Sequence, residues 1–149
     1  MGLTILSSIE ASQAFGESWA AELTGGEIIA LHGVLGAGKT QLVKGLARGL
    51  GFAGDVTSPT FTLIHEYRGP VITLYHIDLY RIDTERELET LALDDLLAPN
   101  CILLIEWGEK FPALRRNQCI EIVLERLKDE PLEDNQAGEG KRRIRRITL

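Results

Sequence analysis

Apolar positions in the N-terminal part of the chain recur at helical spacing. Ser7 and Glu10 have the spacing of a capping box, which predicts that a helix begins there. Gly25 and Gly26 predict the end of this helix. Between these limits an apolar stripe predicts one buried helix face: Ala11, Phe15, Trp19 and Leu23.

A short apolar run, residues 27–32, follows with little alternation and is typical of a strand that is covered on both faces. A glycine-rich segment comes next, and a second helix then follows from about Lys39. This second helix carries apolar residues on one side: Leu42, Val43, Leu46 and Leu50. Strand, glycine loop and helix are the order that a phosphate-binding loop requires.

The second half of the chain repeats the alternation of strands and helices. Residues 69–78 and 101–107 are predicted core strands that lead to Asp78 and Glu106, and Thr84 begins a helix between them. Two strands near the C-terminus flank a polar segment, residues 128–140, which we expect to be a mobile loop. The fold class is therefore α/β: a P-loop NTPase-like sandwich with a mostly parallel central sheet and antiparallel C-terminal strands, in a single domain over residues 1–149.

Charge and composition limit the possible partners. The chain has 16 Lys and Arg residues against 22 Asp and Glu residues, and a formal charge of −6 opposes broad, unaided nucleic-acid binding. A basic run at residues 141–146 is most often a solvated strand face, and a binding role toward partners or tRNA is the alternative interpretation. No apolar segment is long enough to span a bilayer and no basic leader is present, so we expect a cytoplasmic protein without a membrane partner. Cys101 and Cys119 are expected to be reduced core thiols.

The glycine-rich segment, residues 33–40, fits the pattern G-x-x-x-x-G-K-[ST] at every fixed position. Glycines allow successive backbone amides to converge on anionic oxygens without a Cβ collision. Lys39 is expected to reach the β and γ phosphates, and the Thr40 hydroxyl to coordinate Mg²⁺. The predicted nucleotide-binding residues are Gly33, Gly36, Ala37, Gly38, Lys39, Thr40 and Gln41.

Hydrolysis also requires an acid that helps to hold the metal and a group that positions water. Glu106 leaves an apolar strand as a metal-holding acid would, although an acid there can also simply cap the strand. Asp78 also ends a strand, and ligands of open α/β sheets lie beyond these ends. Asp78 therefore has two interpretations: it orients water or supports the metal, or it pairs with Arg81.

Two further residues are candidates for the catalytic site. Thr60 lies in a hydroxyl-rich segment between a helix and the next strand, where GTPases keep a segment that senses the γ phosphate. The alternative interpretation of this segment is an ordinary turn. Trp107 follows Glu106, and it either packs near the nucleotide or only fills the core.

The motifs that are missing favour ATP as the nucleotide. The sequence has no N-K-x-D and no D-x-x-G after a strand, which opposes a Ras-like GTPase. A small-molecule kinase shares the glycine motif but requires an arginine-bearing lid, and no such segment is recognisable. A kinase is therefore the second choice after an ATPase.

Four segments in this order, GVLGAGKT, VTSPTFTLIHEY, LYHIDLYRI and ILLIEWGEK, resemble the bacterial TsaE family, also called YjeE. The resemblance implies a slow, Mg²⁺-dependent P-loop ATPase of tRNA threonylcarbamoyladenosine biosynthesis, which acts on the adenosine next to the anticodon through the TsaB and TsaD partners and meets tRNA only indirectly. It also implies that Lys39 grips phosphates and that Thr40 and Glu106 hold Mg²⁺. Asp78 and Trp107 would then support catalysis.

Two positions depart from the family pattern. Val34 stands where the family usually has Asp, and Gln41 stands where a second threonine is common. Without an acid at position 34, the chain lacks one group that would position water or support the metal. An alternative therefore remains, in which ATP acts on a nearly inert binding module as a conformational ligand.

Overall fold

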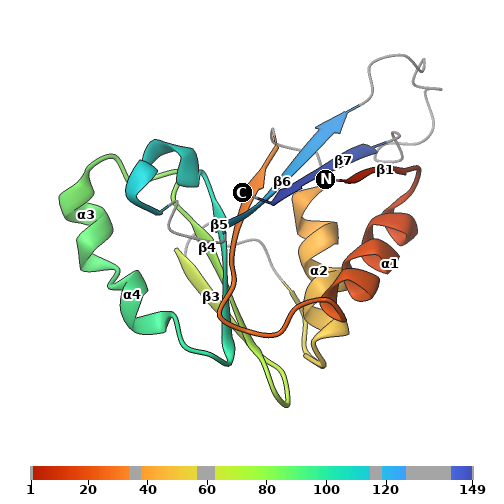
Figure 1. The fold of residues 1–149 in the computed structure, drawn as a ribbon, viewed down its shortest axis with the longest axis horizontal. Helices are drawn as coiled ribbons and strands as arrows, with labels where there is room; N and C mark the ends of the chain where they lie inside the picture. The colour runs from red at the N-terminus through yellow and green to blue at the C-terminus, as the bar shows by residue number, and fades with distance from the viewer. Residues whose placement is uncertain (1, 34–37, 57–62, 115–118, 127–141, 149) are drawn as a thin grey trace.

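The computed structural model describes residues 2–33, 38–56, 63–114, 119–126 and 142–148. Its strands form one sheet with the order β1-β7-β6-β2-β5-β4-β3 (Figure 1). The strands are β1 (Gly2–Leu6), β2 (Ile28–His32), β3 (Ile64–Arg68), β4 (Thr73–Asp78), β5 (Cys101–Glu106), β6 (Cys119–Arg126) and β7 (Arg142–Thr148).

The centre of the sheet is parallel and its two sides are antiparallel. β2 lies parallel between β5 and β6, and β4 is parallel to β5. β7 is antiparallel to both β6 and β1, and β3 is antiparallel to β4. The predicted α/β class, with a mostly parallel centre and antiparallel C-terminal strands, is confirmed.

Helices cover the sheet from both sides (Figure 1). α1 (Ile9–Ala20) and α2 (Lys39–Gly49) pack together on one side, and α3 (Glu85–Thr90) and α4 (Leu93–Leu96) lie on the other. Two short 3₁₀ helices, η1 (Gly108–Lys110) and η2 (Pro112–Leu114), follow β5. The part of the chain that the structure describes contains no helix long and apolar enough to cross a membrane.

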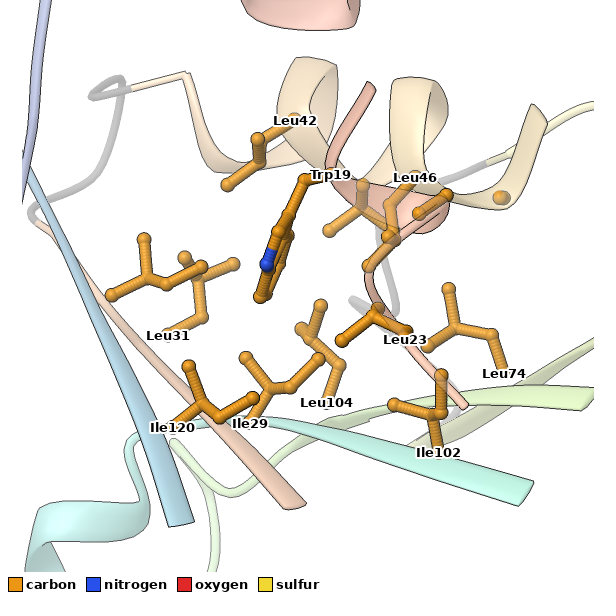
Figure 2. Packing of buried hydrophobic residues seen from close by; sticks show 14 of the residues in the cluster. Trp19, Leu23, Ile29, Leu31, Leu42, Leu46, Leu74, Ile102, Leu104 and Ile120 are labelled. Carbon is orange, nitrogen blue, oxygen red and sulfur yellow. The ribbon is translucent and has the colours of Figure 1, made fainter. Parts of the chain in front are cut away.

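The apolar stripes of α1 and α2 form the larger core cluster against the sheet. In Figure 2, Trp19 lies between Leu42 of α2 and the sheet residues Leu31 and Ile29. All four of these side chains are buried; helical spacing predicts this for Trp19 and Leu42, and the apolar run of residues 27–32 predicts it for Leu31 and Ile29. Cys101 and Cys119 are buried free thiols, so that prediction is confirmed as well.

The predicted limits of α1 are wrong at both ends. The N-cap is Ser8 and not Ser7, because the Ser8 hydroxyl accepts a hydrogen bond of 3.0 Å from the Ala11 amide, which is three residues on. The helix ends at Ala20, where backbone bonds of the i to i+3 type replace the α-helical pattern. Leu23 is still buried, although it lies beyond the helix.

Three elements of the structure were not predicted from the sequence patterns. β1 and β3 are short edge strands, and α4 has a single turn. Strand β7 forms from the basic C-terminal segment as predicted, whereas the polar segment 128–140 lies outside the described residues. β1 and β3 take their places by pairing with β7 and β4, and this pairing depends on segments distant in the sequence or on a turn.

Glycines bring α1 and α2 into close contact. A Cβ on Gly45 of α2 would overlap the backbone carbonyl of Gln13 in α1, and backbone cannot move aside cheaply. We expect Gly45→Ala to lower the free energy of unfolding by about 3 kcal/mol, because overpacking outweighs the better helix propensity of alanine. Urea unfolding measures this change. Gly2→Ala is the matched control, since a Cβ there meets nothing within 4 Å; equal stability of both variants would contradict the prediction.

Candidate functional site

The glycine motif joins β2, the strand in the middle of the sheet, to the start of α2 (Figure 1). Gly33 follows β2 directly, and Gly38 is the N-cap of α2 with a φ of 96°, a left-handed conformation that suits glycine. The N-cap glycine has no side chain that could accept from the first amides of α2, so within the described residues the cap leaves these donors available. Gly36 and Ala37 lie outside the described residues.

Lys39 and Glu106 meet although they are far apart in the sequence. Parallel pairing of β2 with β5 places Leu31 opposite Glu106, so Glu106 lies beside the strand that leads into the glycine motif. The Lys39 ammonium nitrogen is 3.7 Å from Glu106 Oε1. Only 8% of the Glu106 side chain is exposed, which makes this pair a nearly buried one.

His76 of β4 approaches the other oxygen of the same carboxylate. Its Nε2 is 3.5 Å from Glu106 Oε2, and only 2% of the His76 side chain is exposed. Burial on its own raises the pKa of Glu106, but the His76 contact and the Lys39 charge together hold the pKa of this carboxyl below its ordinary value. Glu106 is therefore a carboxylate between two basic side chains.

Asp78 ends the next strand along the sheet. It lies opposite Glu106 in the β4–β5 register, as we expected for two acids at strand ends. Asp78 Oδ1 accepts a hydrogen bond of 2.9 Å from the Tyr80 amide. Within the described ranges there is no ion pair between Asp78 and Arg81. The alternative interpretation, in which Asp78 pairs with Arg81, is therefore wrong.

Trp107 follows Glu106 with a left-handed backbone, at a φ of 63°. For a bulky residue this conformation costs about 1–2 kcal/mol and persists only where the surroundings fix it. The Lys39 ammonium lies 5.7 Å from the centre of the Trp107 ring, within cation–π range. Trp107 therefore contacts the motif lysine and is not only a core residue.

Three of the predicted site residues remain: Thr40, Gln41 and Thr60. Thr40 and Gln41 lie in the first turn of α2. The side-chain amide of Gln41 accepts a hydrogen bond of 2.8 Å from Gln13 of α1, a contact that ties Gln41 to the neighbouring helix. Thr60 lies outside the described residues, so its sensing role stays a prediction.

Sequence reasoning assigned no role to three residues that the structure places near this group. They are His76, Tyr80 and Lys110. His76 and Tyr80 belong to the segment LYHIDLYRI, and their spacing around Asp78 is the one signal that indicated them. Lys110 lies in the segment ILLIEWGEK, but its contacts join segments that only the fold brings together, so its role was not indicated.

The low pKa of Glu106 predicts how stability depends on pH. A carboxyl whose pKa is lower in the folded than in the unfolded chain stabilises the fold above its unfolded pKa, and this contribution is lost as the pH falls through the folded pKa. We expect the free energy of unfolding of the wild type to fall on acidification more steeply than that of Glu106→Gln. Urea unfolding over a series from neutral to acid pH measures both slopes. Glu89→Gln, at an exposed position in α3, is the control and is expected to keep the wild-type slope.

The fold and this site define a class of proteins. The class has an α/β fold with a mostly parallel central sheet, a G-x-x-x-x-G-K-[ST] motif between a central strand and the following helix, and an acid at the end of the adjacent strand. Comparison with known proteins identifies the family within this class. The model of the family "Threonylcarbamoyl adenosine biosynthesis protein TsaE" matches residues 6–136, and the chain belongs to the TsaE family.

Individual relatives agree with the family assignment. A Synechocystis sp. protein named "tRNA threonylcarbamoyladenosine biosynthesis protein TsaE" is 45% identical over 113 residues, which cover 73% of this chain and 71% of that protein. A Bacillus subtilis protein of the same name is 38% identical over 133 residues, or 89% of this chain and 83% of that protein. Among solved structures, Bacillus subtilis YdiB aligns with 99% of this chain and 84% of its own, at 31% identity and a TM-score of 0.73. The chain thus belongs to a family of tRNA threonylcarbamoyladenosine biosynthesis.

Proposed function

We propose that this protein is a Mg²⁺-dependent ATP hydrolase that drives tRNA threonylcarbamoyladenosine biosynthesis through the partner proteins TsaB and TsaD. The observation that carries the proposal is the contact between Lys39 of the glycine motif and Glu106 at the end of the adjacent parallel strand. A phosphate-contacting lysine beside a buried carboxylate is the pairing that metal-assisted phosphoryl chemistry requires.

Lys39 and the start of α2 supply the phosphate contacts in this proposal. The backbone amides at the N-terminus of α2 and the helix dipole attract anionic oxygens. Lys39 pairs with Glu106 across 3.7 Å, and in the nucleotide complex its ammonium contacts the phosphates instead. This exchange of partners would free the Glu106 carboxylate to hold Mg²⁺.

Thr40 and Glu106 are the residues that would hold Mg²⁺, which would neutralise charge on the phosphate oxygens. The donor set fits, because Mg²⁺ prefers oxygen ligands and takes only one or two from protein when phosphates supply others. In the parts of the chain with described structure, no group of three or more His, Cys, Asp and Glu residues is placed to hold a metal ion. A site completed by phosphate oxygens is consistent with this small set.

Asp78 and Trp107 complete the proposed catalytic group. Asp78 lies beside Glu106 in register and is positioned by the Tyr80 amide, which suits an acid that orients water or supports the metal. The Trp107 ring lies within cation–π range of Lys39, whose side chain is 12% exposed. Thr60 remains the proposed sensor of the γ phosphate.

Phosphate release from ATP, measured with and without TsaB and TsaD, tests the proposal. We expect slow Mg²⁺-dependent release by the protein alone and faster release with both partners. Chelation of Mg²⁺ with EDTA is the control and is expected to abolish release. Release that is absent both alone and with partners would contradict the proposal.

One observation favours a second candidate, a binding module for which ATP is a conformational ligand. Val34 replaces an acid that is common in the family, and this loss affects hydrolysis more than binding. In this case association with TsaB and TsaD depends on ATP and survives Glu106→Ala, whereas a hydrolase that cycles with its partners would be trapped or uncoupled by the same change. Association measured for wild type and variant, with ATP and with ADP, separates the two candidates.

A further inference from the structure

Lys110, the last residue of η1, is bonded to the segment that follows β4. Its ammonium nitrogen donates to the carbonyl oxygen of Tyr80 at 2.7 Å and to those of Ile82 and Leu79 at 3.4 and 3.5 Å. Asp83 Oδ1 adds an ion-pair contact at 3.8 Å. An ammonium group has three donors, and here all three face carbonyls of one loop.

This contact joins the two segments that leave the proposed catalytic strands. The loop with Tyr80 begins directly after Asp78, and η1 begins directly after Trp107. The strands already lie in register, with Asp78 opposite Glu106, and the Leu79 amide donates to the Glu106 carbonyl at 3.0 Å. Lys110 fixes the same two chain segments a few residues further from the sheet.

The same side chain lies over two aromatic rings. The Lys110 nitrogen is 5.5 Å from the ring centre of Tyr80 and 6.0 Å from that of Trp107, and the two ring centres are 5.1 Å apart. The Lys39 nitrogen also lies 5.7 Å from the centre of the Trp107 ring. Lys110, Tyr80, Trp107 and Lys39 thus form a continuous row of contacts that ends at the glycine motif.

The backbone of Trp107 requires such support. Its left-handed conformation is unfavourable for a tryptophan, so contacts around it must hold it. The Tyr80 ring is one of these contacts, and 61% of Tyr80 is exposed, so core packing does not hold that ring in place. The bonds from Lys110 to the backbone on both sides of the Tyr80 side chain do so instead.

We propose that Lys110 is a positioning residue, which fixes Tyr80 against Trp107 and thereby holds Trp107 against the phosphate-contacting Lys39. The part that concerns ATP hydrolysis rests on the proposed function. Lys110 itself contacts both rings and acts on the reaction only through Trp107.

The test compares Lys110→Met with its parent in a Trp19→Phe background. The chain has two tryptophans, so Trp107 is then the only indole emitter. We expect Lys110→Met to increase quenching of Trp107 by acrylamide and to shift its emission to longer wavelength. For Mg²⁺-ATP we expect kcat to fall about tenfold with KM within about twofold, since misplacement affects the transition state more than ground-state binding.

Two further variants keep the outcome clear. Arg68→Met is the matched control, because it also removes a cation from a surface ion pair, at an exposed position in β3. Tyr80→Ser removes the exposed ring without touching the core and is expected to raise Trp107 quenching as Lys110→Met does. Wild-type quenching in Lys110→Met and Tyr80→Ser, or raised quenching with unchanged kcat, would overturn the positioning role. If the parent hydrolyses no ATP, the proposed function fails, and Trp107 quenching alone decides the role of Lys110.

Discussion

Glu106→Gln is expected to lower Mg²⁺-dependent ATP hydrolysis about 100-fold, the size of effect found when a group that supports a metal site is removed. Glutamine keeps the shape of the side chain but removes the charge that would hold Mg²⁺. The carboxylate is nearly buried between Lys39 and His76, so the substitution removes the charge at a fixed position. ATP affinity without Mg²⁺ is expected to stay the same or to increase, because Lys39 no longer has to leave an anionic partner.

Phosphate release and calorimetric titration with ATP, each at several Mg²⁺ concentrations, measure these two effects. Glu89→Gln removes an exposed carboxylate from α3 and is expected to behave as wild type. A Glu106→Gln variant with wild-type turnover at every Mg²⁺ concentration would show that Glu106 only caps its strand.

Lys39→Met is expected to weaken ATP binding about 10- to 100-fold. Hydrogen bonds to charged groups contribute about 1.5–3 kcal/mol each, and 1.4 kcal/mol corresponds to a factor of ten in affinity. Methionine keeps most of the side chain's length, so the change isolates the ammonium group. Titration calorimetry with ATP and with adenosine measures the loss, and adenosine affinity is expected to be unaffected because adenosine has no phosphates.

Lys44→Met is the matched control for Lys39→Met, since it removes a cation from the same helix away from the glycine motif. Among the described residues, Lys39→Met leaves Glu106 with His76 as its remaining basic neighbour, so its thermal unfolding is measured beside the binding. Wild-type ATP affinity in a folded Lys39→Met variant would contradict the phosphate role of the motif.

Local signals in the sequence were enough for the glycine motif and the strand-end acids. The motif requires only a strand before it and a helix after it, and apolar runs and helical spacing indicate both. Glu106 and Asp78 each end a run of apolar residues, and parallel strands bring their carboxyl ends to one edge. The alternation of strands and helices along the chain likewise predicted the parallel centre of the sheet.

Short-range patterns were insufficient where two neighbouring residues compete or where an element is only partly buried. Ser7 and Ser8 are chemically equal as caps, and the packing of α1 decides between them. The edge strands β1 and β3 take their position from the strands that they pair with. Their own sequences show no clear alternation, so they were missed.

The amino-acid sequence by itself determined the fold class, the glycine motif and the two acids at strand ends, because each depends on residues close together in the chain. Only the tertiary structure decided that β5 lies beside β2, which brings Glu106 to Lys39. It also decided that His76 approaches Glu106 and that Lys110 meets Tyr80 and Trp107. Strand order and register arise from packing between distant segments, and no local pattern of residues encodes them.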